Sequence, residues 1–174
     1  GGTPVQAWSP PAALRACKLP TTTCRVYDGG NCKNYPSRLF NRMVAPFSGW
    51  GLRSFLWYQG EANSDEGFPL YRDEYACAFA RMIDGWRQAW AAAVAEATPG
   101  APVVETPFVF VQLSSWTGNW GFEGLPCVAS YCPVIARVKL AQADVAGFGG
   151  RGADWAVNAT GMAVADDWGA TQSE

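Results

Sequence analysis

The segment from Tyr71 to Ala97 limits the fold more than any other feature, because its pattern fits one long helix. Its apolar residues recur three or four positions apart, at Tyr75, Phe79, Ile83, Trp86, Trp90 and Val94. Residues with this spacing share one face of an α-helix. Pro99-Gly100 then supplies a stop signal. The sequence therefore predicts one long amphipathic helix with a single face in the core.

Two short apolar segments flank this helix. Leu52 to Tyr58 is apolar and aromatic and is bounded by glycines, as is typical of a β-strand. Phe108 to Leu113 is a nearly continuous apolar run, typical of a strand covered on both faces. Alternating helices and buried strands predict the α/β class with a mostly parallel sheet.

The remaining predicted elements are shorter. They are helices at 10–17, 38–45 and about 133–145, and one or two strands within 155–157 and 162–165. Ser9 and Ser37 are the expected N-caps of the first two helices, while residues 1–9 and 18–36 are expected to be loops. A chain of 174 residues without a repeat or a low-complexity linker predicts a single domain over 1–174.

The composition excludes several kinds of site. The chain contains no histidine, so it cannot by itself assemble a Ser-His-Asp triad or a histidine-ligated metal centre. We therefore expect no metal and no cofactor. The formal net charge of -2 gives no electrostatic reason to expect nucleic acid or an anionic membrane as a partner. No apolar run approaches the length of a membrane span, and no signal peptide is visible.

The six cysteines predict disulfides, since none of them has the C-x-x-C spacing of a zinc site. More than one pairing is possible. The pairing favoured by short loop closure is Cys24–Cys32 and Cys127–Cys132, which leaves Cys17–Cys77. Disulfides persist in oxidising compartments, and Asn158-Ala159-Thr160 is an acceptor sequence for N-glycosylation. Together these features predict a secreted or lysosomal glycoprotein.

Polar side chains follow the first predicted strand, in the stretch WYQGEAN (Trp57–Asn63). In parallel sheets, ligands bind beyond the carboxyl ends of the strands. The neutral carboxamide of Gln59 can donate an N–H to a developing negative charge, as an oxyanion hole requires; alternatively, it caps backbone groups of the turn. Glu61 and Asn63 can orient Gln59, bind a hydroxylated substrate or cap the following turn. Gly1-Gly2-Thr3 can offer a backbone N–H to the same anion, because glycine permits close approach.

Six segments of the chain, in this order, resemble the sialate O-acetylesterases, which are carbohydrate esterases of the SGNH-hydrolase type. The segments are GGTPVQAWS (1–9), LFNRMVAPF (39–47), FLWYQGEAN (55–63), YRDEYACAFARMIDGWR (71–87), FVFVQLSS (108–115) and GMAVADD (161–167). The resemblance implies a three-layer α/β/α, flavodoxin-like fold. It also implies a serine esterase that removes acetyl groups from the hydroxyls of sialic acids.

The resemblance also assigns roles to residues. In the family, a serine in a GQSN-like segment attacks the acetyl carbonyl, and a histidine near the C-terminus acts as the base. A glycine of the GGT segment and the glutamine of WYQGE hold the oxyanion, which here means Gly1 or Gly2 together with Gln59. Glu61 and Asn63 match the family motif as supports or substrate contacts.

The chain departs from the family pattern because it has neither a GQSN segment nor a histidine. We therefore expect a partial domain, with a sheet incomplete at both ends, that is inactive by itself. The expected partner is an O-acetylated sialoglycan or a related acetylated sugar. Two alternatives are a lectin-like module that binds glycans without catalysis and an acetylesterase acting on plant or microbial polysaccharide.

Overall fold

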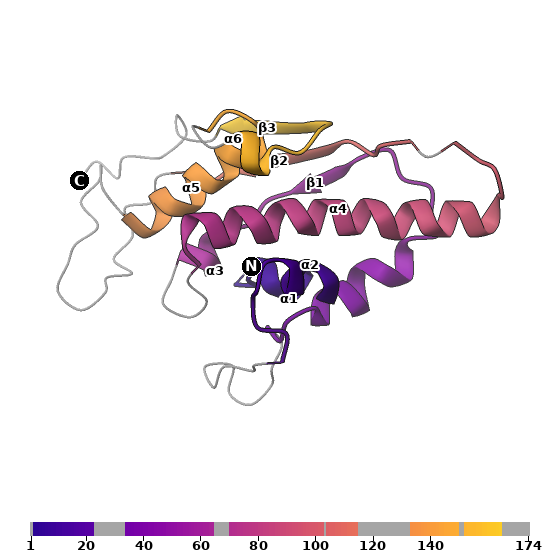
Figure 1. Ribbon diagram of the computed structural model, residues 1–174, viewed down its shortest axis with the longest axis horizontal. Helices are drawn as coiled ribbons and strands as arrows, with labels where there is room; N and C mark the ends of the chain where they lie inside the picture. Colours follow the sequence, from indigo (N-terminus) through magenta and orange to yellow (C-terminus); the bar gives the residue numbers. More distant parts are fainter. Residues whose placement is uncertain are drawn as a thin grey trace, which may run out of the picture.

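A parallel three-stranded sheet forms one layer of the described structure, and helices pack against one of its faces (Figure 1). The computed structural model describes residues 2–22, 34–64, 70–102, 104–114, 133–149 and 152–164. The strands are β1 (Phe55–Trp57), β2 (Phe108–Gln112) and β3 (Thr160–Val164), and they stand side by side in that order. Phe55 pairs with Phe108, and Phe110 pairs with Met162.

Two helices connect these parallel strands. The chain runs from β1 through α4 (Arg72–Ala97) to β2, and from β2 through α5 (Pro133–Val145) to β3. Parallel neighbours require such crossovers. At the start of α4, the Tyr71 backbone N–H donates to the Glu74 carboxylate over 2.9 Å, which satisfies one of the free amides of the first turn. The predicted α/β class, the parallel sheet and the long helix are confirmed.

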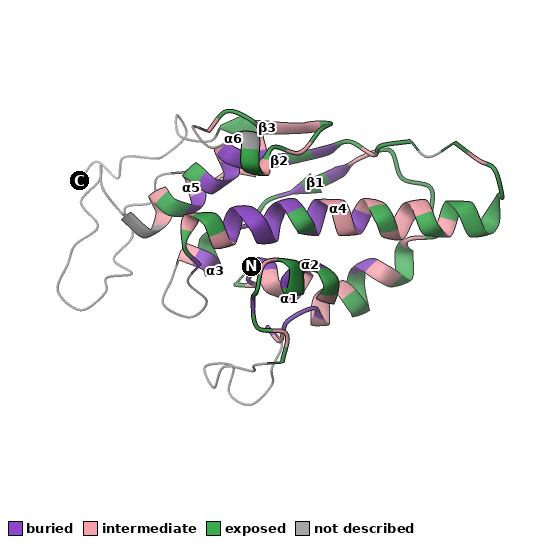
Figure 2. Cartoon of the chain, viewed as in Figure 1, coloured by how far each residue is buried: buried purple, intermediate pink, exposed green. Residues whose placement is uncertain are grey.

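One face of the sheet packs against α4 and forms the core. The Phe79 ring of α4 meets the Phe110 ring edge-on, with centroids 4.9 Å apart. Trp86 makes a similar contact with Trp57 at 5.5 Å. Burial follows the predicted stripe along the first half of α4, whereas Val94 in the second half is 44% exposed (Figure 2). The apolar stripe on α4 is therefore longer than the part of the helix that packs on the sheet.

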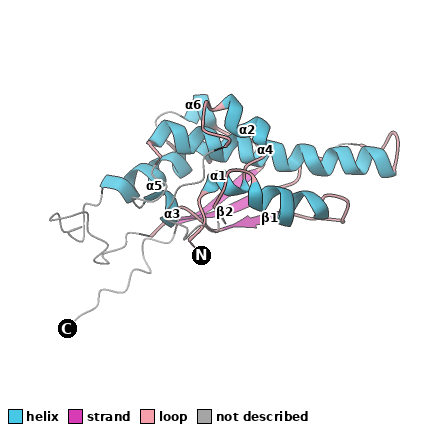
Figure 3. Cartoon of the chain, turned by 90° about the horizontal axis from the view of Figure 1, so that it is seen from below, coloured by secondary structure: helices cyan, strands magenta, loops and turns pink. Residues whose placement is uncertain are grey.

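In the described part of the chain, both crossover helices lie on the same side of the sheet (Figure 3). Helix α5 packs along α4, and its Val138 and Val145 belong to the same apolar core. Alternate residues of a strand point to opposite faces, so Leu56 and Val109 face away from these helices. They are 80% and 39% exposed.

Shorter helical segments complete the described structure. They are α1 (Val5–Trp8), α2 (Pro11–Ala16), the π-helix η2 (Phe40–Val44), the 3-10 helix η3 (Ala45–Phe47), α3 (Glu61–Ser64) and α6 (Gly152–Trp155). The predicted helices at 10–17 and about 133–145 and the strand near 162–165 are confirmed. Residues 38–45 are helical as predicted, but with π-helical geometry in η2.

Three local predictions are wrong. Residues 5–8 were expected in a loop but form α1, where Val5 and Ala7 are buried. Ser9 is not the N-cap of α2, because Pro10 occupies that position and the Ser9 hydroxyl donates to the Val5 carbonyl over 2.9 Å. No strand forms at 155–157, since Trp155 ends α6 and its apolar side chain packs against the core from a helix.

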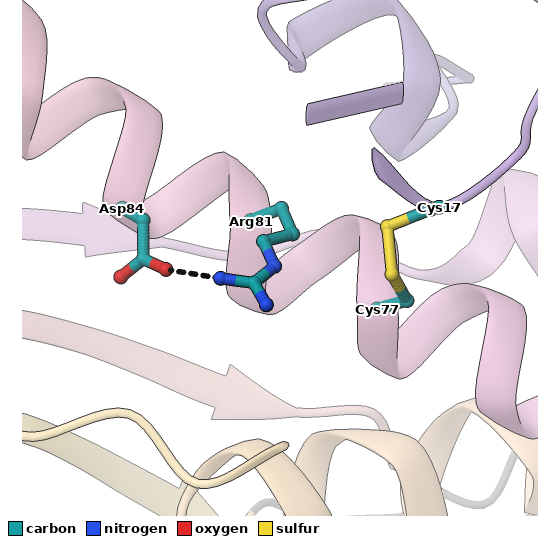
Figure 4. Close-up of a disulfide and its surroundings, with 4 residues drawn as sticks. All are labelled: Cys17, Cys77, Arg81 and Asp84. Atoms are coloured by element: carbon teal, nitrogen blue, oxygen red, sulfur yellow. Dashed lines mark hydrogen bonds and ion pairs between the residues drawn. A yellow bond between two sulfur atoms is a disulfide. The ribbon is translucent and has the colours of Figure 1, made fainter. Parts of the chain in front are cut away.

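A disulfide joins Cys17, at the end of α2, to Cys77 of α4 (Figure 4). The two Cα atoms lie 5.8 Å apart, within the usual range for a disulfide. This predicted pair is confirmed and indicates a compartment outside the reducing cytosol. The other four predicted partners, Cys24, Cys32, Cys127 and Cys132, lie outside the described residues. None of the described helices is long and apolar enough to span a membrane.

Candidate functional site

Gln59 lies two residues after the end of β1, at the carboxyl end of the sheet, and only 6% of it is exposed. Its Nε2 donates to the Thr3 carbonyl oxygen at 3.0 Å and to Asn63 Oδ1 at 2.8 Å. Its Oε1 accepts a hydrogen bond from the Tyr75 hydroxyl at 3.0 Å. The carboxamide is therefore held in one orientation from both ends.

Tyr75 supports Gln59 from the first turns of α4. Its side chain is fully buried, and this burial, with a smaller contribution from the charge of Glu61, raises the pKa of the phenol above its ordinary value. The hydroxyl therefore stays protonated and can donate to Gln59 throughout the range in which proteins fold. This bond specifies which end of the carboxamide is the acceptor.

Asn63 connects the loop after β1 to the N-terminal segment. Its Oδ1 accepts from the Val5 backbone N–H at 2.8 Å as well as from Gln59, and its Nδ2 donates to Gln6 Oε1 at 2.8 Å. Asn63 is completely buried, whereas Glu61 is exposed at the start of α3. Of the roles considered for these residues, the geometry favours orientation of Gln59 for Asn63 and leaves Glu61 accessible to a ligand.

Gln142 of α5 also belongs to the hydrogen-bonded group around Gln59, although the sequence analysis did not identify it. Its Nε2 donates to the Gln59 carbonyl oxygen at 3.1 Å, and its Oε1 accepts from the Leu113 backbone N–H at 3.0 Å. Gln142 is completely buried and so bridges the chain segments that leave β1 and β2. The signal for it is its position on the same helix face as Val138 and Val145, where a polar side chain needs buried partners.

A partly buried ion pair joins α4 to α5 beside the hydrogen-bonded residues around Gln59. Arg72, the first residue of α4, donates through Nε and Nη2 to the two carboxylate oxygens of Asp144, each over 2.7 Å. The Asp144 side chain is completely buried in α5. These hydrogen bonds raise the pKa of Arg72. Breaking this ion pair by removal of one partner would be costly in stability, because the charge that remains lies in a largely buried site.

Gly60 explains why the motif needs a glycine after Gln59. Its φ is +148°, in a region that L-residues rarely adopt. A Cβ at this position would lie 2.8 Å from the Leu113 side chain and 2.9 Å from that of Val138. The backbone after Gln59 therefore passes directly beneath α5, where there is no room for a side chain.

We expect Gly60→Ala to lower the free energy of unfolding by about 2–3 kcal/mol, from backbone strain and overpacking. Gly49→Ala is the matched control, because nothing lies within 4 Å of its added Cβ; its effect should stay within about 0.5 kcal/mol. Urea unfolding of both variants measures the difference. Equal stabilities for the two variants would contradict the close packing at Gly60.

The N-terminal glycine segment reaches the same site. Gly1 lies outside the described residues, while Gly2 is exposed, has φ +73° and accepts a hydrogen bond from Asn34 Nδ2 at 3.2 Å. The next residue, Thr3, meets Gln59 through its carbonyl. The fold thus brings Thr3, the neighbour of Gly2, against Gln59, which also contacts Asn63. Asn158, by contrast, is exposed in the turn before β3. Among the described residues, no cluster of acidic, cysteine or histidine side chains is suited to a metal ion.

Both N–H groups of the Gln59 carboxamide have acceptors in this structure. The bond to Asn63 is buried, and the bond to Thr3 is only partly buried. An external oxygen that accepts from Nε2 must therefore replace one of these two acceptors, and the bond to the Thr3 carbonyl is the less buried of the two.

The amino-acid sequence of the chain is similar to those of curated sialate O-acetylesterases. It is 35% identical to the sialate O-acetylesterase of Homo sapiens over 115 residues, which is 66% of the chain and 20% of that protein. It is 32% identical to the sialate O-acetylesterase of Rattus norvegicus over 153 residues, covering 70% of the chain and 27% of that protein. The chain is a relative of the sialate O-acetylesterases. It thus spans only about a fifth to a quarter of these curated relatives, and no family model matches it.

A solved structure agrees with this relationship at the level of the fold. A carbohydrate acetylesterase from Xanthomonas citri superimposes with a TM-score of 0.59 at 24% identity. The match covers 94% of this chain and 28% of that one. The α/β fold class expected from the resemblance to sialate O-acetylesterases is thereby confirmed.

Proposed function

We propose that this chain is part of a carbohydrate esterase that removes O-acetyl groups from sialic acids, and that Gln59 donates to the oxyanion. The buried and rigidly held carboxamide of Gln59 supports this role most directly, because preorganised donors stabilise developing charge without reorganisation. Its position at the carboxyl end of a parallel strand is the place where such sheets bind ligands. The similarity to sialate O-acetylesterases supports the same role.

The proposed reaction is acyl transfer. A serine hydroxyl attacks the acetyl carbonyl, a histidine accepts the hydroxyl proton, and the carbonyl oxygen becomes an oxyanion bound by Gln59 Nε2–H and a backbone N–H of Gly1 or Gly2. Collapse of this intermediate breaks the bond to the sugar oxygen, which takes the proton from the histidine and leaves as a hydroxyl. Water then attacks the acetyl-serine with the neutral histidine again as base, which releases acetate and restores the serine. Since the chain contains no histidine, the base is supplied from outside this chain.

This role requires a local rearrangement at Thr3. Because both N–H groups of Nε2 already have acceptors and the bond to Thr3 is the less buried, the Thr3 carbonyl gives up its bond to Gln59 when substrate binds. Asn63 Oδ1 and Tyr75 keep the carboxamide in place during this exchange. Glu61, exposed beside the site, is positioned to accept hydrogen bonds from sugar hydroxyls.

We expect the purified 174-residue chain to release no acetate from an O-acetylated sialoside above a buffer control. The protein from the complete open reading frame, which we expect to add the serine and the histidine, should release acetate from the sialoside faster than from acetylated xylan. Chromatographic measurement of acetate for both proteins and both substrates gives the comparison.

The other outcomes each contradict a defined part of the proposal. Acetate release by the chain alone would show that its own residues supply the nucleophile and base. Faster release from xylan would identify a polysaccharide esterase. If the complete protein binds sialoglycans without releasing acetate, it acts as a lectin.

A further inference from the structure

A groove lies between α4 and the segment that joins α6 to β3. Its volume is about 300 Å³, and its lining includes Arg81, Asp84, Asp154, Trp155 and Asn158. It adjoins the turn from which β3 starts, so it lies at the amino ends of the strands. Gln59 lies at their carboxyl ends, and the groove is therefore separate from the candidate active site.

Asn158 is presented on an ordered turn beside this groove. The carbonyl oxygen of the next residue, Ala159, accepts hydrogen bonds from the Phe108 backbone N–H and from Arg87 Nη2, each at 3.0 Å. The Thr160 hydroxyl donates to the Val157 carbonyl at 2.7 Å. The side chain of Asn158 is exposed, so the backbone of the acceptor triplet is held while its asparagine faces solvent.

We propose that Asn158 carries an N-linked glycan and that the first sugar of this glycan occupies the groove. The Asn158 carboxamide nitrogen attacks the anomeric carbon of a lipid-diphosphate-linked oligosaccharide. The bond between that carbon and the phosphate oxygen breaks, the lipid diphosphate leaves, and the nitrogen loses one proton. A host oligosaccharyltransferase performs this transfer, and the triplet Asn158-Ala159-Thr160 is its recognition sequence.

The lining of the groove suits an N-acetylhexosamine. Trp155 is half-buried and belongs to the lining of the groove, and the C–H face of a sugar can pack against the accessible part of an aromatic ring. Arg81 and Asp84 form an exposed ion pair on α4 at 3.4 Å (Figure 4), so both can also bond to hydroxyl and acetamido groups. The groove volume is at the lower end of small-ligand pockets, which begin at about 300 Å³.

The Cys17–Cys77 disulfide supports the proposal independently. Disulfides form in the same oxidising compartment in which secreted proteins meet the glycosylation machinery. The triplet is also the one Asn-X-Ser/Thr sequence in the whole chain, so any N-glycan on this chain must be attached to Asn158. The proposal does not depend on esterase activity.

Secretion of the full chain from a eukaryotic cell tests the attachment. We expect tryptic peptides with a glycan on Asn158 in the wild type and in Thr160→Ser, which keeps both the acceptor triplet and a hydroxyl. Asn158→Gln and Thr160→Ala should lack the glycan. Unmodified Asn158 in the wild type, with a co-expressed glycoprotein normally glycosylated, would overturn the proposal.

Thermal unfolding tests the position of the first sugar. Trimming with an endoglycosidase that leaves one N-acetylglucosamine should keep the Tm, whereas Asn158→Gln should lower it by about 2–4 °C, as expected for the loss of a modest contact in a chain of this size. This comparison avoids an amidase, which would convert Asn158 to aspartate beside Asp154.

A double-mutant cycle supplies the control, because Trp155 also packs against the core. In a Trp155→Ala background, Asn158→Gln should change the Tm by less than about 1 °C, since the ring that the sugar contacts is gone. An equal Tm for the glycosylated wild type and Asn158→Gln would show that the sugar lies outside the groove and would overturn that part of the proposal.

Discussion

Replacement of Gln59 by alanine is expected to lower kcat of the complete esterase by about 100- to 1,000-fold, with a smaller effect on KM. The reason is that the Nε2–H bond to the oxyanion forms fully only in the transition state. Rates of acetate release over a range of sialoside concentrations measure both constants. An unchanged kcat would remove Gln59 from the oxyanion hole.

The structural role of Gln59 calls for two controls. Without its carboxamide, the Tyr75 hydroxyl and the acceptors on Thr3 and Asn63 lose a partner, at a cost of about 1–3 kcal/mol for each buried group. Labelling with a serine-reactive fluorophosphonate therefore serves to count the folded active sites. Gln88→Ala, an exposed glutamine on α4, should leave kcat unchanged.

Tyr75→Phe separates positioning from catalysis. This change removes the hydrogen bond to Gln59 Oε1 but keeps the Nε2 donors. We expect kcat to fall at most about tenfold, since a neutral hydrogen bond contributes about 1 kcal/mol. If Tyr75→Phe and Gln59→Ala lowered kcat equally, orientation alone would account for both effects.

Replacement of both Cys17 and Cys77 by alanine is expected to lower the free energy of unfolding by about 4 kcal/mol. The two residues are 60 positions apart, and closing a loop of that length reduces the entropy of the unfolded chain by this amount in the chain-entropy description. Urea unfolding of the wild type and the double variant, monitored by tryptophan fluorescence, measures the change.

The single variants test the origin of this effect. Cys17→Ala and Cys77→Ala each break the bond, so each should lose nearly as much stability as the double variant. A loss below about 1 kcal/mol in the double variant would mean that packing of α2 on α4 holds the N-terminal segment without the cross-link.

Regular elements were predictable where the sequence carries a long period. Five consecutive apolar spacings, from Tyr75 to Val94, identified α4 because each repeat adds to the same signal. Helix α1 has four residues, too few for a period to be recognised. Its helical form depends on burial of Val5 and on the bond from the Val5 N–H to Asn63. Val94 has the predicted spacing but is exposed, because periodicity identifies a face of a helix and not the extent of the sheet beneath it.

The residues of the candidate site likewise fall into those that the sequence predicted and one that it did not. The motif WYQGEAN identified Gln59, Glu61 and Asn63 through local order along the chain. Gln142 was missed although it is completely buried, because a glutamine within a helix is also common on surfaces. Gln142 acquires its hydrogen-bond partners Gln59 and Leu113 only when α5 packs beside β1 and β2.

The sequence by itself determined the strand-helix-strand unit and the polar motif after its first strand, and it favoured the pairing of Cys17 with Cys77 without excluding others. These follow from periodicity, from turn chemistry and from the spacing of like residues, which are all properties of short stretches. Only the tertiary structure decided which groups surround Gln59. Its partners Thr3 and Gln142 lie 56 and 83 positions away, and hydrogen bonds between such distant segments leave no local pattern, because they form only after the helices have packed on the sheet.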